Sequence, residues 1–122
     1  MKLERHVGGL SLGRKAHYLR TRGWREEQGR WASDRYGAYP LAKALHHQLT
    51  EDLSGALCAL GWEISGYSER GYVQLRDGGG GRPCSLPKAL RTLARRERRP
   101  VGELTYAFFL AALLDAEGAP PG

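Results

Sequence analysis

The stretch LTEDLSGALCALGWEISGYSERGYVQLR, residues 49–76, changes its hydrophobic period part of the way along. Its first part continues a repeat in which leucines stand three or four residues apart, at positions 41, 45, 49, 53, 57 and 60. That spacing places them on one face of a helix. From Trp62 onward apolar and polar residues alternate, and the polar turn SERG separates two such runs, 62–67 and 71–76. We therefore expect a helix followed by a β-hairpin.

The helical part has two interpretations. Pro40 suits the first turn of a helix, and Gly61 suits the position just after its end, so one long helix would be well bounded. Thr50, however, is also a good N-cap, because the two carboxylates that follow it would lie in the first turn of a new helix and favour its dipole. The segment forms either one long helix or two short ones with a turn near residues 47–49.

The flanking segments have simpler patterns. On the N-terminal side, residues 12–22 have helical spacing, and residues 24–39 show no clean period, which suits a loop that could include a short strand. On the C-terminal side, the glycine-rich residues 77–82 predict a flexible linker, followed by helices over 87–98 and 101–115. Ser11 is suited to cap the helix expected at 12–22, and Ser85 is suited to cap the helix expected at 87–98.

The fold class that follows is α+β: a small, mostly helical domain with one β-hairpin and two C-terminal helices. We expect a single domain over residues 1–117 and a flexible tail at 118–122, because a chain of 122 residues is of ordinary domain size. The first residues hold no long apolar run, so no signal peptide is expected. The most apolar segment, residues 101–114, is too short for the ~20 residues of a membrane span. A soluble, cytoplasmic protein without membrane contact is expected.

Positive charge is concentrated in two blocks. Residues 1–39 carry nine Lys/Arg against four Asp/Glu, and residues 78–100 carry seven against one, within a net charge of +6. The middle, residues 40–77, carries three Lys/Arg against five Asp/Glu, and residues 101–122 carry no Lys/Arg against three Asp/Glu. Basic blocks favour a polyanionic partner, because each phosphate that is neutralised releases counterions. The alternative is a solvated surface on an arginine-rich protein.

The order of helices and hairpin resembles the winged helix-turn-helix superfamily over residues 12–76. In the resemblance YPLAKALHHQ is the second helix, TEDLSGALCALG the reading helix and WEISGYSERGYVQLR the wing. The family inserts its third helix in the major groove, which implies DNA binding here. Reading helices offer Arg, Lys, Asn or Gln to bases, whereas this one would offer Glu51, Asp52 and Ser54. The wing is better suited, with Arg70 at its tip and Arg76 at its end.

Because the middle is acidic, the flanks are expected to bind the phosphates. In the helix predicted at 87–98, cations recur along one side at spacings of three and four, and arginine contacts phosphates bidentately without reading sequence. This set comprises Lys88, Arg91, Arg95 and Arg98, extended by Arg96 and Arg99. The N-terminal set comprises Arg14, Lys15, Arg20, Arg22, Arg25 and Arg30. Trp24 and Trp31 lie among these cations and either stack unpaired bases or belong to the core. We expect both sets to form one continuous surface.

The last predicted helix carries more apolar groups than one face can bury. Such a helix is either central to the core or covered by a partner chain, most simply in a homodimer. The candidate interface residues are Tyr106, Phe108, Phe109, Leu110 and Leu113.

No set of residues indicates catalysis, and no metal ion or cofactor is expected. His46 and His47 are adjacent, which is poor spacing for shared metal ligation, and Cys58 and Cys84 form no CxxC pair. The expected function is therefore non-enzymatic: a small basic DNA- or RNA-binding protein, accessory or regulatory, that contacts backbone phosphates. The alternative is a non-catalytic interaction or assembly subunit, for example an accessory or phage-type subunit, that uses its apolar C-terminal helix.

Overall fold

The computed structural model describes residues 11–118, with side chains to residue 115; most of the tail expected at 118–122 lies outside this range. Within it the chain forms four helices and two small antiparallel sheets, with 53% helix and 22% strand, so the α+β class is confirmed. The helices are α1 (Leu12–Thr21), α2 (Leu41–Ala59), α3 (Leu86–Glu97) and α4 (Val101–Gly118). The first sheet is β1 (Arg25–Glu27), β2 (Arg30–Ser33) and β3 (Gly37–Tyr39). The second is β4 (Trp62–Tyr67), β5 (Val73–Asp77) and β6 (Cys84–Ser85).

Helix α2 is continuous, which decides between the two interpretations of the leucine repeat. Thr50 does not cap a new helix; its Oγ1 donates to the backbone oxygen of His46 at 2.8 Å, one turn back. At the end of α2, Gly61 has a φ of 98°, as expected for a residue that follows a helix. The turn between a second and a reading helix, which the winged-helix resemblance implied, is therefore absent. The reason is that Leu45, Leu49, Leu53 and Leu57 are all buried on one face, so the packing of the leucine stripe continues through the point where a turn would have interrupted it.

The first sheet occupies the segment that we expected to be a loop with a short strand. Three antiparallel strands are present, and Trp31 pairs with Tyr39 across β2 and β3. Gln28 and Gly29 both have positive φ, 52° and 77°, which suits the two-residue turn of a tight hairpin. Strands of three and four residues are too short to show a period in the sequence.

The hairpin expected at 62–76 is present as β4 and β5, and β6 adds a third strand that the sequence did not predict. The glycine-rich segment before β6 is tied to the rest of the fold at Gly78. A Cβ on Gly78 would lie 2.3 Å from the backbone oxygen of Gly61, so the two backbones meet where only glycine fits. This part of the expected flexible linker is a close backbone packing site.

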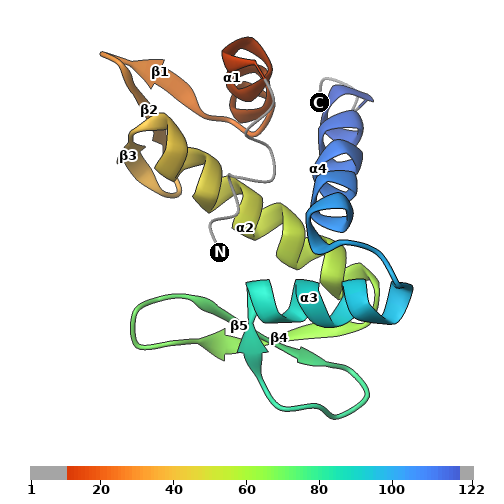
Figure 1. The fold of residues 1–122 in the computed structure, drawn as a ribbon. Coiled ribbons are helices and arrows are strands. Elements are labelled where there is room, and N and C mark those ends of the chain that lie inside the picture. Colours follow the sequence, from red (N-terminus) through yellow and green to blue (C-terminus); the bar gives the residue numbers. More distant parts are fainter. Residues whose placement is uncertain (1–10, 119–122) are drawn as a thin grey trace.

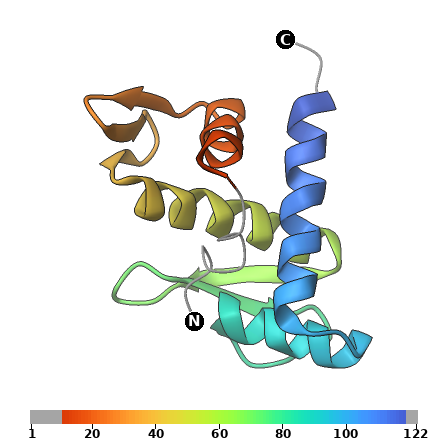
Figure 2. The ribbon, with the colours of Figure 1, turned by 45° about the horizontal axis from the view of Figure 1, so that its top comes forward.

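Helix α2 lies in the middle of the molecule. Figures 1 and 2 show α1 and the first sheet on one side of α2, and the second sheet and α3 on the other. Helix α4 crosses the C-terminal part of α2 and contacts α1, α2 and α3 (Figure 2). The apolar side chains of these layers form one buried cluster, which includes Leu49, Leu53 and Leu57 of α2, Leu75 of β5, Leu90 of α3 and Leu104 of α4. None of the helices in residues 11–118 combines the length and apolar character that crossing a lipid bilayer requires.

Candidate nucleic-acid interface

The two candidate stacking tryptophans belong to the core, so their assignment to base stacking is wrong. Trp24 and Trp31 are only 2% and 4% exposed. Trp24 also donates from Nε1 to the side-chain oxygen of Gln48 at 3.0 Å, inside the protein. A nucleobase needs an open ring face, and neither indole offers one.

Three of the six N-terminal cations contact groups of their own chain. Arg22 pairs with Asp52 at 3.2 Å and donates to the backbone oxygen of Ala112 at 3.1 Å. Arg25 pairs with Glu27 at 3.3 Å and with Asp34 at 3.2 Å. The guanidinium of Arg20 lies 5.3 Å from the ring centroid of Trp31. Within the described range, Arg14, Lys15 and Arg30 are the members of the N-terminal set without an ion pair or ring contact.

The C-terminal set divides into paired and unpaired cations. Arg96 binds Asp77 and lies over the ring of Trp62, and this ion pair together with the N–H of Gly79 holds the pKa of Asp77 below its usual value. Arg99 lies 3.6 Å from Glu97 and from Glu103.

The unpaired members of the C-terminal set have no carboxylate partner anywhere in residues 11–115. They are Lys88, Arg91, Arg95 and Arg98, all exposed, which we call the α3 basic face. Ala89, Leu90 and Leu93 are buried on the other side of the helix, so packing directs these cations outward. The Ser85 hydroxyl caps α3 as expected, accepting from the N–H of Lys88 at 3.3 Å.

The two basic sets do not form the single surface that we expected. The N-terminal set lies on α1 and the first sheet, on one side of α2, while the α3 basic face lies on the other side (Figures 1 and 2). Of the two wing arginines, Arg76 pairs with Glu63 at 2.9 Å, and Arg70 is exposed. The α3 basic face is therefore a separate surface, with Arg70 on the neighbouring sheet.

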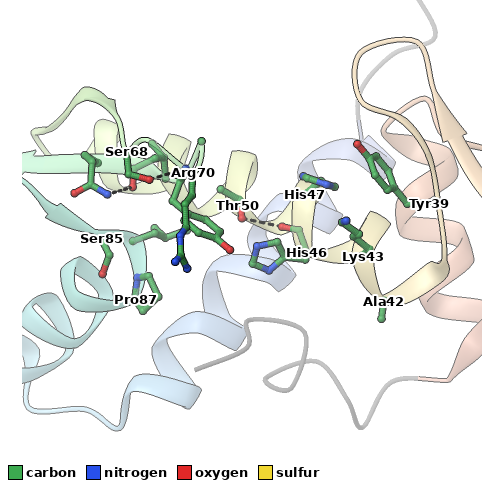
Figure 3. Close-up of a pocket in the computed structure, with 15 residues that line it drawn as sticks. Tyr39, Ala42, Lys43, His46, His47, Thr50, Ser68, Arg70, Ser85 and Pro87 are labelled. Carbon is green, nitrogen blue, oxygen red and sulfur yellow. Dashed lines mark hydrogen bonds between the residues drawn. The ribbon is translucent and has the colours of Figure 1, made fainter.

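Next to the start of α3 lies a groove of about 960 Å³ between α2 and the tip of the β4–β5 hairpin. We call it the α2–hairpin groove. Figure 3 shows Lys43 and His46 reaching into it from α2 and Arg70 from the hairpin. Among the residues that the structure describes, no carboxylate lines the groove; its lining consists of Tyr39, Ala42, Lys43, His46, His47, Thr50, Ser68, Arg70, Gly71, Tyr72, Val73, Gln74, Ser85, Leu86 and Pro87. The sequence patterns did not indicate this groove, because residues from β3, α2, the β4–β5 hairpin, β6 and α3 form it together.

Aromatic rings form one end of the α2–hairpin groove. The ring of His47 stacks on Tyr36 at 5.3 Å and lies 4.7 Å from Tyr39, and Tyr36 in turn stacks on Trp24 at 5.7 Å. Burial lowers the pKa of His47, and the positive charges of His46 and Lys43 lower it further. His47 is therefore held neutral, and its Nε2 has no hydrogen-bond partner among the described residues.

A buried polar cluster around Asp52 joins α1 to α2. The Asp52 carboxylate accepts hydrogen bonds from the Tyr18 hydroxyl, from Arg22 Nε at 3.2 Å and from Gln48 Nε2 at 3.3 Å. Burial and the neighbouring carboxylate raise the pKa of Tyr18 far above its usual value. Glu51 likewise binds Arg35 and Tyr36. Both carboxylates lie in the middle of α2 and hold other elements, so the interpretation that they lie in the first turn of a helix is wrong.

The apolar residues of α4 mainly complete the core. Phe109 is 1% exposed and Leu113 is also buried, so both are removed from the candidate interface. Tyr106, Phe108 and Leu110 are half-buried and pack against the same core. Leu114 is 64% exposed.

Among residues 11–118, no group of three or more His, Cys, Asp or Glu side chains could hold a metal ion. Comparison of the chain with protein-family models, with curated proteins and with solved structures finds no match. The function is therefore argued from the geometry of this chain.

Proposed function

We propose that this protein binds the backbone phosphates of a nucleic acid and that the α3 basic face is the contact surface. It would act as a cytoplasmic accessory or regulatory factor rather than as an enzyme. The proposal is based on the difference between two groups of basic residues in and next to α3. Arg96 and Arg99 have carboxylate partners, whereas Lys88, Arg91, Arg95 and Arg98 have none in the described chain. A cation that is already paired gains little from a phosphate, because its own carboxylate must first be displaced.

Phosphate contacts of this kind position a protein without reading sequence. The residues that the winged-helix resemblance assigns to base reading support the same conclusion, because Asp52 and Ser54 face into the fold and Glu51 binds Arg35 and Tyr36. We therefore expect binding with little sequence preference. Four unpaired cations correspond to a slope of about −3 to −4 in a plot of log affinity against log salt concentration for duplex DNA.

The test is charge reversal on the α3 basic face with a matched control. Lys88→Glu, Arg91→Glu and Arg95→Glu together should weaken binding to random-sequence DNA more than about 100-fold at ~0.1 M salt, because three phosphate contacts become repulsive. The control reverses Arg14, Lys15 and Arg30, which changes the net charge equally on the other side of α2. Binding is measured by fluorescence anisotropy over a salt series. Equal loss in both variants would show only a net-charge effect, and full affinity in the α3 variant would exclude the proposal.

The alternative interpretation, an assembly subunit that docks through α4, has less support. Phe109 and Leu113 lie in the core of their own chain, so only the half-buried side chains and Leu114 remain for a partner. The proposal accordingly treats one chain as the binding unit and does not require a homodimer.

A further inference from the structure

We infer that the α2–hairpin groove holds one unpaired nucleotide of a single strand, whose neighbouring phosphates continue onto the α3 basic face. The inference rests on the proposed function and deepens it, since it assigns single-stranded rather than duplex nucleic acid as the preferred ligand. It also assigns a role to Tyr72, Arg70 and Lys43, which phosphate binding on α3 does not use.

The charge of the groove suits an anion. Lys43 lines it from α2 and Arg70 from the hairpin, and none of the lining residues within the described range is a carboxylate. Lys43 Nζ lies 5.2 Å from the ring centroid of Tyr39, so its position is supported by the groove wall. Arg70 is exposed and has no ion pair within residues 11–115. A phosphate bound at either cation would neutralise charge that the described part of the protein leaves unbalanced.

The groove also offers what a base requires. Tyr72 is 58% exposed and lines the groove, whereas Trp24 and Trp31 are buried. A base can stack on an accessible tyrosine ring only when it is unpaired, because in a duplex its faces are covered by neighbouring base pairs. The volume of about 960 Å³ lies within the ~300–1,000 Å³ of small-molecule sites and is large enough for a nucleotide.

One end of the groove lies at the start of α3, the helix that carries the α3 basic face. Ser85, Leu86 and Pro87 line the groove, and the next residue, Lys88, is the first member of that face. Figure 3 shows Arg70 extending between Pro87 and His46, toward the start of α3. A strand that leaves the groove at this end reaches the first turn of α3, where Lys88 and, about one helical turn further on, Arg91 are exposed.

The test compares a labelled oligothymidylate of about 12 nucleotides, within the ~4–16 nucleotides of single-strand sites, with a duplex of equal length and with oligouridylate. Tyr72→Ala should weaken binding to both single strands about 5- to 140-fold, the range expected for loss of one stacked base, and leave duplex binding unchanged. Tyr72→Phe keeps the ring and should bind as the wild type does.

Tyr67→Ala is the matched control, because Tyr67 lies on the same hairpin, is 69% exposed and does not line the groove. It should keep full affinity. As a second variant, Arg70→Ala should reduce the salt slope for the single strand by about 0.7, which corresponds to one phosphate contact. Thermal melting checks that each variant is folded.

The outcomes distinguish a wrong groove assignment from a wrong proposed function. If the wild type binds nucleic acid but Tyr72→Ala and Arg70→Ala bind the single strand as tightly and with the same salt slope, the groove assignment is wrong while the proposed function stands. Equal losses in Tyr72→Ala and Tyr67→Ala would also overturn the groove assignment. If the wild type binds neither strand form, the proposed function fails and the groove assignment with it.

Discussion

Asp52 shows how a single carboxylate can have a role that its sequence context conceals. It follows Thr50 and Glu51 in a pattern typical of a helix start, yet it accepts hydrogen bonds from Tyr18, Arg22 and Gln48. Tyr18 is fully buried, so its hydroxyl depends on this carboxylate. A buried donor that loses its partner costs about 1–3 kcal/mol, and more when the partner is charged.

We expect Asp52→Ala to lower the free energy of unfolding by about 2–4 kcal/mol, because it leaves the Tyr18 hydroxyl and Arg22 without their acceptor. In a Tyr18→Phe background the same change should cost at least ~1 kcal/mol less, because one of the orphaned donors is gone. Urea denaturation of the two single variants and the double variant measures this coupling. Strictly additive losses of unfolding free energy would mean that the hydrogen bond between Tyr18 and Asp52 contributes nothing to stability.

At the scale of elements, the loop after β5 and the turn between α2 and β4 meet through a close backbone contact. The loop after β5 passes the turn between α2 and β4 at Gly78, where the backbone oxygen of Gly61 occupies the space of a side chain. Gly79, one residue later, has only the Asp77 side chain near its missing Cβ, at 3.8 Å. The two glycines are adjacent, but they differ in what an added methyl group would meet.

Gly78→Ala should therefore destabilise the protein by about 1–3 kcal/mol, because the turn or the loop must move to accept the methyl group. Gly79→Ala should change stability by no more than about 1 kcal/mol and can raise it, because alanine restricts the unfolded chain. Thermal unfolding followed by circular dichroism compares the pair. Similar melting temperatures for both variants would contradict the close contact at Gly78.

For the whole molecule, α4 is the element that joins the two sides of α2. Phe109 meets the ring of Tyr18 of α1 edge-on, with centroids 4.8 Å apart, and Arg22 donates to the backbone oxygen of Ala112. At the other end, α4 packs against α3. Burial of Phe109 therefore holds α4 against α1, while the other end of α4 is held by α3.

Phe109→Ala is expected to cost about 3–5 kcal/mol, the usual loss when a buried phenylalanine leaves a cavity. Leu114→Ala, a truncation of an exposed side chain on the same helix, should stay within about 0.5 kcal/mol. Chemical denaturation of both variants at several protein concentrations provides the measurement. A large, concentration-dependent cost for Leu114→Ala would instead indicate that α4 has a partner in solution.

The sequence by itself determined the elements whose signals are local. The leucine spacing predicted helical structure over the range of α2, without deciding between one helix and two. The alternation after Trp62 predicted the β4–β5 hairpin, and Ser85 predicted the start of α3. Helical period, strand period and capping all act between residues a few positions apart. The first sheet and β6 were not predicted, because strands of two to four residues are too short to show a period.

Only the tertiary structure decided which charged and aromatic side chains are available to a partner. Arg96 finds its carboxylate 19 residues away and Arg22 finds its own 30 residues away, so no local pattern separates them from unpaired Arg91 and Arg95. The same holds for Trp24 and Trp31, which the fold buries, and for Tyr72, which it leaves open beside α3. Composition sets the total charge, but ion pairing and burial arise from contacts between distant segments, which exist only after the chain has folded.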